Sequence, residues 1–366
     1  MHDHSTQIAG DQRALLSARF LLGLLATSVV TAGCGESPAA PLPRTVVIST
    51  VVNVDGLSDE MIINVPDMTR SIGLVIEGNP NGLYALGAFT TPDGITQLDL
   101  PSAALATTMQ ASYRDEQIGQ MPGALFQSIR LGTFTHVYPY RPDQSLLAGQ
   151  LRLRIASDTP GDVKITAIMP PDDGGNVLHV NLVVVSDTRT ITAPPAFLAE
   201  ARTLLAQAGI DLIVDQIIPI RGSALARITE STEPQESPTS MTAMLPALVK
   251  DLSLGNALDL FWVDSLPAGI GGLALGTPGP PVRGSGYFGV AFVETGGPAN
   301  TGRVLAHEIC HFLALQHVQN VGVSGRLYPD PLDDTEVGIS NLMTRGSALT
   351  PNQAWSLLRS PLLQVP

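Results

Sequence analysis

Short apolar runs, each followed by a turn signal, fill the chain from Arg44 to about residue 171. Runs such as EMIINV, SIGLVIEG and LRLRIAS are rich in β-branched residues, and NPNG, PDG and TPGD lie between runs of this kind. Strands of this length and spacing predict an antiparallel β-sandwich. The segment 45–171 holds no cluster of histidine, cysteine and carboxylate residues. We therefore interpret it as an accessory domain or a pro-domain.

The pattern changes after PPDDGGN at 170–176, which we take as the boundary between two domains. LHVNLVVVS at 178–186 is almost entirely apolar, as a buried strand requires. A helical pattern ends at Gly209, and further strands are expected at 211–220, 257–266 and 287–294. The sequence thus predicts a multidomain chain, with an N-terminal all-β sandwich followed by an α/β (α+β) domain at 176–366.

One helical segment of the second domain concentrates the candidate chemistry. HEICHFLALQH, at 307–317, holds three of the chain's seven histidines. His307 and His311 lie one helical turn apart on one face, a spacing that lets two imidazoles share a metal ion. Glu308 lies beside them, where a carboxylate reaches a metal-bound water rather than the metal. The alternative is a buried helix whose histidines are simply satisfied by hydrogen bonds.

The third histidine constrains the backbone. In an unbroken helix His317 would lie about 280° around the axis from His307 and roughly 9 Å beyond His311. The three imidazoles can meet on one ion only if the chain leaves the helix between Leu313 and His317. Glycine suits such a turn because positive φ costs it nothing, whereas Ala314 adopts it at about 1 kcal/mol or somewhat more. A bound zinc ion contributes far more than this to folding.

Composition and the amino terminus add an expectation about location. A net charge of −13 argues against a nucleic-acid partner, because phosphate binding needs basic surface. Arg13 and Arg19 precede FLLGLLATSVVTAGC, an apolar run of signal-peptide length. Its end resembles a bacterial lipobox, with Thr31 where leucine is usual. The resemblance implies a lipoprotein signal peptide at 1–33 and lipidation of Cys34. A plain secretory signal is the alternative.

A lipid anchor would make the membrane a partner of the exported protein. Residues 34–44 are rich in proline and alanine and would form a tether. We expect a location at the cell envelope, at the outer membrane in a Gram-negative host, or at the cell surface. With Cys34 lipidated, Cys310 has no disulfide partner. Cys310 is expected to be a small buried hydrophobe, with a role as a fourth metal ligand as the alternative.

Two motifs together resemble those of the metzincin zinc endopeptidases. HEICHFLALQH resembles HExxHxxGxxH, with alanine at the glycine position, and SNLMT at 340–344 resembles the Met-turn of that clan. DPLDDTE at 330–336 and the tail after it are similar to pappalysin- or cytophagalysin-like members. The resemblance covers roughly 178–366, and its specific motifs are confined to 307–344.

The resemblance implies a role for each matching residue. His307, His311 and His317 would bind one zinc ion and leave a fourth position open for water. Glu308 would be the general base to that water and then the proton donor to the leaving amine. Met343 would lie beneath the ion as an apolar floor. Thr344 and Arg345 stand where some members carry a tyrosine that assists zinc.

The strand ahead of the histidine helix, 286–294, would bind a protein or peptide substrate in antiparallel register. This assigns substrate binding to five residues: Gly286, Tyr287, Phe288, Gly289 and Val290.

Two classes of function follow. The first is a zinc endopeptidase that hydrolyses peptide bonds. The second is a non-catalytic surface lipoprotein with a ligand-binding β-domain and a degenerate zinc domain. Joint retention of the three histidines, Glu308 and Met343 favours the enzyme, whereas Ala314 favours the alternative.

Other polar residues have simpler interpretations. Asp330, Asp333 and Asp334 lie in a proline-containing turn that would suit calcium, with an ordinary solvated acidic turn as the alternative. His136 and His179 are isolated from other metal-ligating residues in the sequence, and we expect them to be structural.

Overall fold

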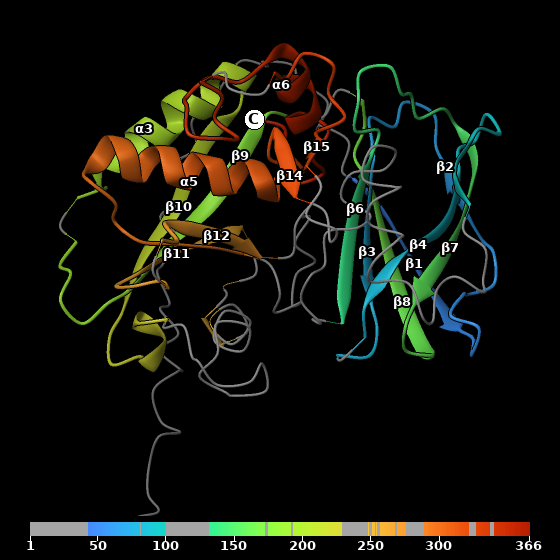
Figure 1. Ribbon diagram of the computed structural model, residues 1–366, viewed down its shortest axis with the longest axis horizontal. Coiled ribbons are helices and arrows are strands. Elements are labelled where there is room, and N and C mark those ends of the chain that lie inside the picture. The colour runs from blue at the N-terminus through green and yellow to red at the C-terminus, as the bar shows by residue number, and fades with distance from the viewer. Residues whose placement is uncertain are drawn as a thin grey trace, which may run out of the picture. The chain divides into compact units, whose positions relative to one another are not determined.

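The computed structural model describes residues 43–80, 82–99, 132–172, 175–191, 193–228, 248, 251–252, 254, 257–267, 269–275, 289–321, 327–336 and 340–366. All of the described residues belong to the unit 41–366, and Figure 1 shows their helices and strands. The expected signal peptide and Cys34 lie outside the described residues, as does nearly all of the tether. Among the helices in the described part of the chain, none is both long enough and apolar enough to cross a membrane.

The β-rich region contains two antiparallel four-stranded sheets, ordered β1-β8-β3-β6 and β2-β7-β4-β5. Alternation places one side of each strand inward, as in β2, where Met61, Ile63 and Val65 are buried. The inward side chains of both sheets meet in one hydrophobic core. The strand bounds are β1 Arg44–Val52, β2 Met61–Val65, β3 Ile72–Glu77, β4 Tyr84–Thr90, β5 Thr96–Asp99, β6 Thr133–Tyr138, β7 Gly149–Ser157 and β8 Gly161–Met169.

His136 lies inside this core rather than at a site. It is 1% exposed and packs edge-on against Phe89, with the ring centroids 5.9 Å apart. Neither imidazole nitrogen has a hydrogen-bond partner among the described residues. Burial lowers the pKa of His136 to about 3. The imidazole therefore stays neutral in the folded chain at any pH near neutrality.

Replacing His136 with leucine is expected to remove a pH-dependent loss of stability. Because the folded pKa is lowered, the unfolded chain binds the extra proton first, and stability falls as pH drops below about 6.5. At pH 5 the protonation of His136 in the unfolded chain lowers the free energy of unfolding by about 2 kcal/mol, because each pH unit below about 6.5 is worth about 1.36 kcal/mol. Urea unfolding of both proteins at pH 7 and pH 5 measures it. The difference between the two proteins cancels the contribution of other titrating groups, and an identical pH dependence would contradict the prediction.

The second region is built on a five-stranded sheet ordered β10-β9-β11-β13-β12. The first four strands are parallel, and β12 is an antiparallel edge strand paired with β13. Every residue of β11 is buried, as expected for a strand covered on both faces. The bounds are β9 Val177–Val185, α3 Ala196–Leu205, β10 Asp211–Ile220, β11 Leu258–Val263, β12 Gly272–Leu275, β13 Gly289–Phe292, α5 Pro298–Phe312, β14 Gln319–Val321, β15 Leu327–Pro329 and α6 Pro351–Leu357.

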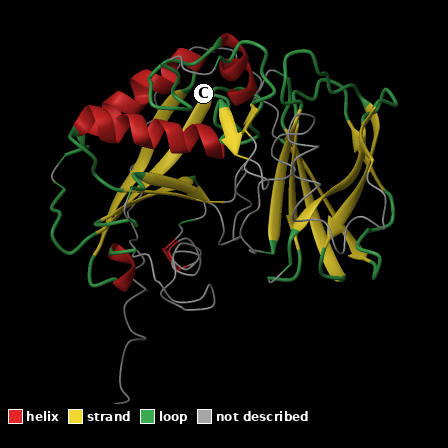
Figure 2. Cartoon of the chain, in the orientation of Figure 1, coloured by secondary structure: helices red, strands yellow, loops and turns green. Residues whose placement is uncertain are grey.

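Helices α3 and α5 lie side by side on one face of this sheet (Figures 1 and 2). Alternate residues of β9 divide between the two faces. Leu182 and Val184 join the core beneath the helices, whereas Val183 and Val185 join a smaller cluster on the opposite face. The combination of a β-rich region with a layered helix-and-sheet region confirms the expected α+β multidomain arrangement.

The expected substrate-binding strand does not lie at an edge of the sheet, and this corrects the sequence prediction. Gly289 and Val290 belong to β13, which pairs with β11 on one side and β12 on the other. A strand with neighbours on both sides has no free backbone groups to offer a peptide. Gly286, Tyr287 and Phe288 lie outside the described residues.

Buried polar contacts join the β-rich region to the second region. The Arg70 guanidinium donates through Nη1 to the carbonyl of Gly175 at 3.0 Å and through Nη2 to that of Ser360 at 3.3 Å. The Ser71 hydroxyl donates to the carbonyl of Arg359 at 2.6 Å. These bonds engage carbonyls that would otherwise lose their water on burial.

Candidate metal centre

Helix α5 carries the first two histidines. It begins after Gly297, with Pro298 at the first helical position, where the missing N–H costs nothing. The buried face of α5 packs into the same hydrophobic core as α3. Its fully buried side chains include Leu305, Ile309 and Phe312. This packing fixes the rotation of the helix, and with it the direction of the side chains on its other faces.

The helix ends where the sequence requires it to end. Its last residue is Phe312, and Ala314 has a φ of 95°. The Ala314 N–H donates to the carbonyl of His311 at 3.0 Å, and the Leu315 N–H donates to that of Cys310 at 2.9 Å. This pair of bonds is the Schellman motif, with alanine at the position that glycine usually takes. The expected break between Leu313 and His317 is confirmed.

The break brings the three imidazoles together. The Nε2 atom of His317 lies 3.2 Å from that of His307 and 3.0 Å from that of His311. One ligand atom from each histidine falls in a group no more than 4.8 Å across. Nitrogens bound tetrahedrally to one ion at about 2.0–2.1 Å would lie about 3.3 Å apart. The three histidines can therefore hold a metal ion.

Two backbone carbonyls fix the tautomers of the His307 and His311 imidazoles. The Nδ1 of His307 donates to the carbonyl of Leu342 at 2.6 Å, and the Nδ1 of His311 donates to that of Leu315 at 2.8 Å. A carbonyl only accepts, so each Nδ1 carries the proton and each neutral ring keeps its Nε2 lone pair for a metal. The turn at Ala314 supplies the Leu315 carbonyl, so it orients His311 as well as delivering His317.

The surroundings keep these rings neutral. Burial lowers the pKa of His307 to about 4, although the carbonyl of Leu342 opposes the shift. Burial also lowers the pKa of His311 well below its usual value, with a further contribution from the neighbouring imidazoles. Neutral imidazole is the form that binds a metal ion.

The segment containing Met343 supplies the Leu342 carbonyl that accepts from His307. Met343 is fully buried, and its N–H donates to the Asn341 side chain at 2.8 Å. The amides of Asn341 and Gln353 exchange two hydrogen bonds, of 2.7 and 3.2 Å. These bonds hold the turn that presents the Leu342 carbonyl to His307.

Sequence reasoning missed Asn341 and Gln353. Gln353 also forms a capping box with Thr350 at the start of α6. A threonine followed three residues later by glutamine is a recognisable helix-start signal, so the position of Gln353 could have been found from the sequence. Its pairing with Asn341 could not.

The side chain of Glu308, a residue of α5, lies between this helix and the edge strand β12. Its side chain is buried, and the residue is 8% exposed. Burial raises the pKa of Glu308 to about 7, and a hydrogen bond from the Ala274 backbone N–H opposes the shift. A carboxyl group in this range can both take and return a proton near neutral pH.

A residue of the β-rich region contacts the segment that carries His317. The Tyr140 hydroxyl accepts from the backbone N–H of Gln316 at 3.4 Å. The Tyr140 carbonyl accepts from the Ser356 hydroxyl at 2.6 Å. Tyr140 is buried in the same cluster as the helix end. The segment that carries His317 is thus supported by a residue of the β-rich region.

The remaining candidates do not join the three histidines in the group that can hold a metal ion. Cys310 is fully buried on the core side of α5, where burial raises the pKa of its thiol. It does not belong to the group that can hold a metal. Thr344 donates from its hydroxyl to the Asn341 carbonyl, and Arg345 is exposed. His179 pairs with Asp215 at 2.7 Å.

The aspartates of the acidic turn have other partners. Asp330 accepts from the Thr335 hydroxyl and from the Leu332 N–H. Asp334 accepts from the Thr350 hydroxyl and the Asn352 N–H, both at 2.8 Å, and so supports the start of α6. In the described parts of the chain, these aspartates do not come together as a metal-binding group.

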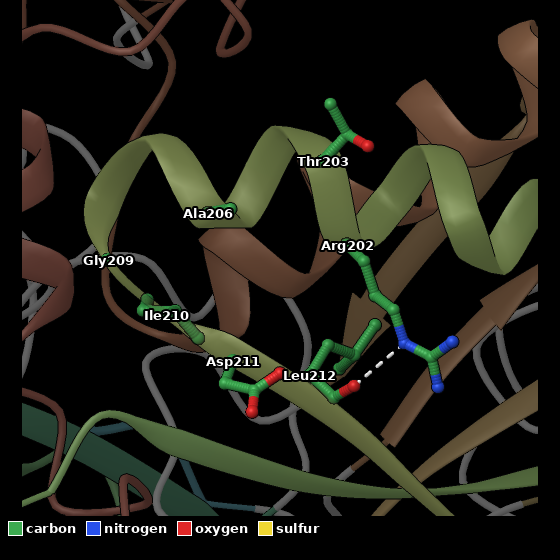
Figure 3. Close-up of a pocket in the computed structure, with 7 residues that line it drawn as sticks. All are labelled: Arg202, Thr203, Ala206, Gly209, Ile210, Asp211 and Leu212. Carbon is green, nitrogen blue, oxygen red and sulfur yellow. Dashed lines mark hydrogen bonds between the residues drawn. The ribbon is translucent and has the colours of Figure 1, made fainter.

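A surface pocket lies at the turn from α3 to β10, away from the histidines (Figure 3). Within it the Arg202 Nε donates to the Leu212 carbonyl at 2.9 Å. Its lining residues are Arg202, Thr203, Ala206, Gly209, Ile210, Asp211 and Leu212. None of them belongs to the metal-binding group.

The comparisons with known proteins add little to what the geometry of the site shows. No protein-family model and no curated protein matches the chain. Among solved structures, the chain is similar to metalloproteinase-II from Bacteroides fragilis, with 13% sequence identity and a TM-score of 0.26. The match covers 44% of this chain and 49% of that one, so the chain spans about half the length of that protein. The function must therefore be argued from the residues of the site.

Substituting Ala314 with glycine is expected to change stability by less than about 1 kcal/mol. Relief of the positive-φ strain at position 314 stabilises the variant by about 1–2 kcal/mol. The added freedom of the unfolded chain and the loss of a buried methyl group each destabilise it by about 1 kcal/mol or slightly less. Ala306, inside α5, provides the matched control. Ala306→Gly should cost about 1 kcal/mol or more, because glycine weakens a helix interior. Thermal unfolding compares the two variants, and equal losses would contradict the account of Ala314.

Proposed function

We propose that this chain is a zinc-dependent endopeptidase of the metzincin type. The observation that carries the proposal is the convergence of the Nε2 atoms of three histidines, with the buried carboxyl group of Glu308 on the helix that carries the first two. A helix that merely satisfied its histidines would not need to turn at Ala314 and bring a third imidazole within 3.2 Å of the first. It would also not need a carboxyl group at this position.

The residues present fit zinc. His307, His311 and His317 would hold the ion, and three neutral nitrogen ligands with an open fourth position are the donor set of a catalytic zinc site. When bound, zinc would polarise the scissile carbonyl and make water more acidic. Glu308 would then act as the general base, because it follows His307 directly on α5 and burial raises its pKa to about 7. It takes the proton of the attacking water and returns it to the leaving amine.

The edge strand β12 is the surface that would bind the peptide. The Val293 N–H donates to the Gly271 carbonyl at 3.0 Å, and Leu273 faces Ala291 in the same register. In an antiparallel pair the residues between such bonded pairs turn their backbone groups outward, so those of Gly272 and Ala274 face away from β13. An extended substrate could add to the sheet along this edge. Such binding reads backbone groups, so it fits an endopeptidase that accepts many sequences.

Metal analysis combined with product analysis tests the proposal. The purified chain should contain about one zinc ion per molecule after mild dialysis. A mixed peptide pool incubated with it should yield internal cleavage products by mass spectrometry. Cleavage should stop on chelation and return when zinc is restored. A zinc-loaded protein that leaves the pool intact would instead support the non-catalytic lipoprotein with a degenerate zinc domain.

A further inference from the structure

Gly272 lies unusually close to the side chain of Glu308. A Cβ atom added to Gly272 would lie 2.6 Å from the Cγ of Glu308 and 2.9 Å from the Cγ1 of Val304. Both distances are well inside van der Waals contact. Any side chain at position 272 would therefore have to displace Glu308 or move Val304. The absence of a side chain at this point lets the carboxylate side chain pass between α5 and β12.

Ala274 takes the next outward-facing position of β12, two residues along the strand, so its backbone groups point in the same direction as those of Gly272. The Ala274 backbone lowers the pKa of Glu308 against the effect of burial, so the carboxyl group lies near this edge of β12. Position 272 is the point at which the Glu308 side chain and β12 approach most closely among the glycines of this segment.

We propose that β12 is a clamp that positions the general base. Gly272 leaves room for the Cγ of Glu308 and so sets the path that this side chain takes past β12. Gly272 is then a positioning residue for the base. This inference rests on the proposed endopeptidase function.

The chain supplies a matched control one residue away. A Cβ added to Gly271 would lie no closer than 3.4 Å to its nearest neighbours, which belong to Thr295 and Val304. That is ordinary van der Waals contact, and Glu308 is not among the atoms it would meet. Gly271→Ala and Gly272→Ala therefore make the same chemical change at adjacent positions, with only the second directed at the base.

Steady-state kinetics of the two zinc-loaded variants tests the clamp. Gly272→Ala is expected to lower kcat by about 10–100-fold, because a misplacement of about 1 Å in a catalytic group costs about that much. Its zinc content should stay close to wild type, because neither of the close contacts involves a histidine. Gly271→Ala should keep kcat within about twofold. Equal kcat values for the two variants would overturn the proposal.

A double-mutant cycle separates positioning of the base from a general effect on the fold. Glu308→Asp shortens the side chain by one methylene and should lower kcat on its own. If Gly272→Ala acts through Glu308, the double variant should be no slower than about the Glu308→Asp variant, so the losses are not additive. If the two losses multiply, Gly272 acts elsewhere and the clamp is wrong.

Crystal structures of the two glycine variants give a reading that does not depend on activity. In Gly272→Ala the Glu308 side chain should move away from position 272, whereas in Gly271→Ala it should stay. If wild type cleaves no peptide but Glu308 moves as stated, the proposed function fails and the clamp stands. If wild type cleaves peptides and Glu308 does not move, only the clamp fails.

Discussion

Replacing Glu308 with glutamine is expected to lower kcat by about 10²–10⁴-fold while the three histidines keep their zinc ion. Glutamine has nearly the same shape, so it fits beside Gly272. It cannot take a proton from water. The loss should therefore appear in kcat, with little change in KM, because in the proposed mechanism the side chain acts on the reaction and not on substrate binding.

The measurement is steady-state kinetics on any peptide found to be cleaved, together with zinc content of both proteins. Glu200 serves as a control, because it is a carboxylate on α3 and lies outside the metal-binding group. Glu200→Gln should retain wild-type kcat. A Glu308→Gln variant that cleaves as fast as wild type with full zinc content would remove Glu308 from the mechanism and, with it, the proposed chemistry.

Binding of zinc is expected to stabilise the folded chain by about 4 kcal/mol when free zinc exceeds its dissociation constant about 1,000-fold. The reason is that His307, His311 and His317 converge only in the folded chain, since the turn at Ala314 brings the last of them to the other two. The unfolded chain has no such preformed site. Calorimetric melting with zinc and with a chelator measures the difference.

Substitution of one ligand tests whether this shift comes from the three histidines. His311→Ala should abolish the increase in melting temperature that zinc causes. His179→Ala removes a histidine that pairs with Asp215 outside the metal-binding group, and it should leave the zinc shift intact. A His311→Ala variant that keeps the full shift would mean that zinc stabilises the chain from another place.

Much of the metal centre could be predicted because helical geometry is local. The spacing of His307, His311 and His317 requires the chain to turn near Ala314, and the turn lies there. The expected α+β arrangement rests on periodicity in the same way. In each case a regular repeat of 3.6 or two residues, read over a short window, carries the information.

The edge strand could not be predicted in the same way. Residues 272–275 read GLAL and come directly after the glycines at 269 and 271, with no polar and apolar alternation to mark a strand. The run YFGVAFVE is apolar enough to be recognised as a strand, and the resemblance assigns it to the substrate, yet its residues 289–292 form the covered strand β13. Order within a sheet depends on long-range pairing, which local periodicity does not report. The pairing of Asn341 with Gln353 and the approach of Tyr140 to Gln316 are hidden for the same reason.

The turn at Ala314 also bears on how such sites are defined by sequence patterns. A pattern that demands glycine at the eighth position of HExxHxxGxxH excludes this chain by one residue, although its three imidazoles converge. What the position must supply is a backbone angle, and alanine supplies it here with both Schellman hydrogen bonds intact. Glycine to alanine is a single-nucleotide step, so related sequences can cross it in either direction. The eighth position is better described as any residue that tolerates positive φ.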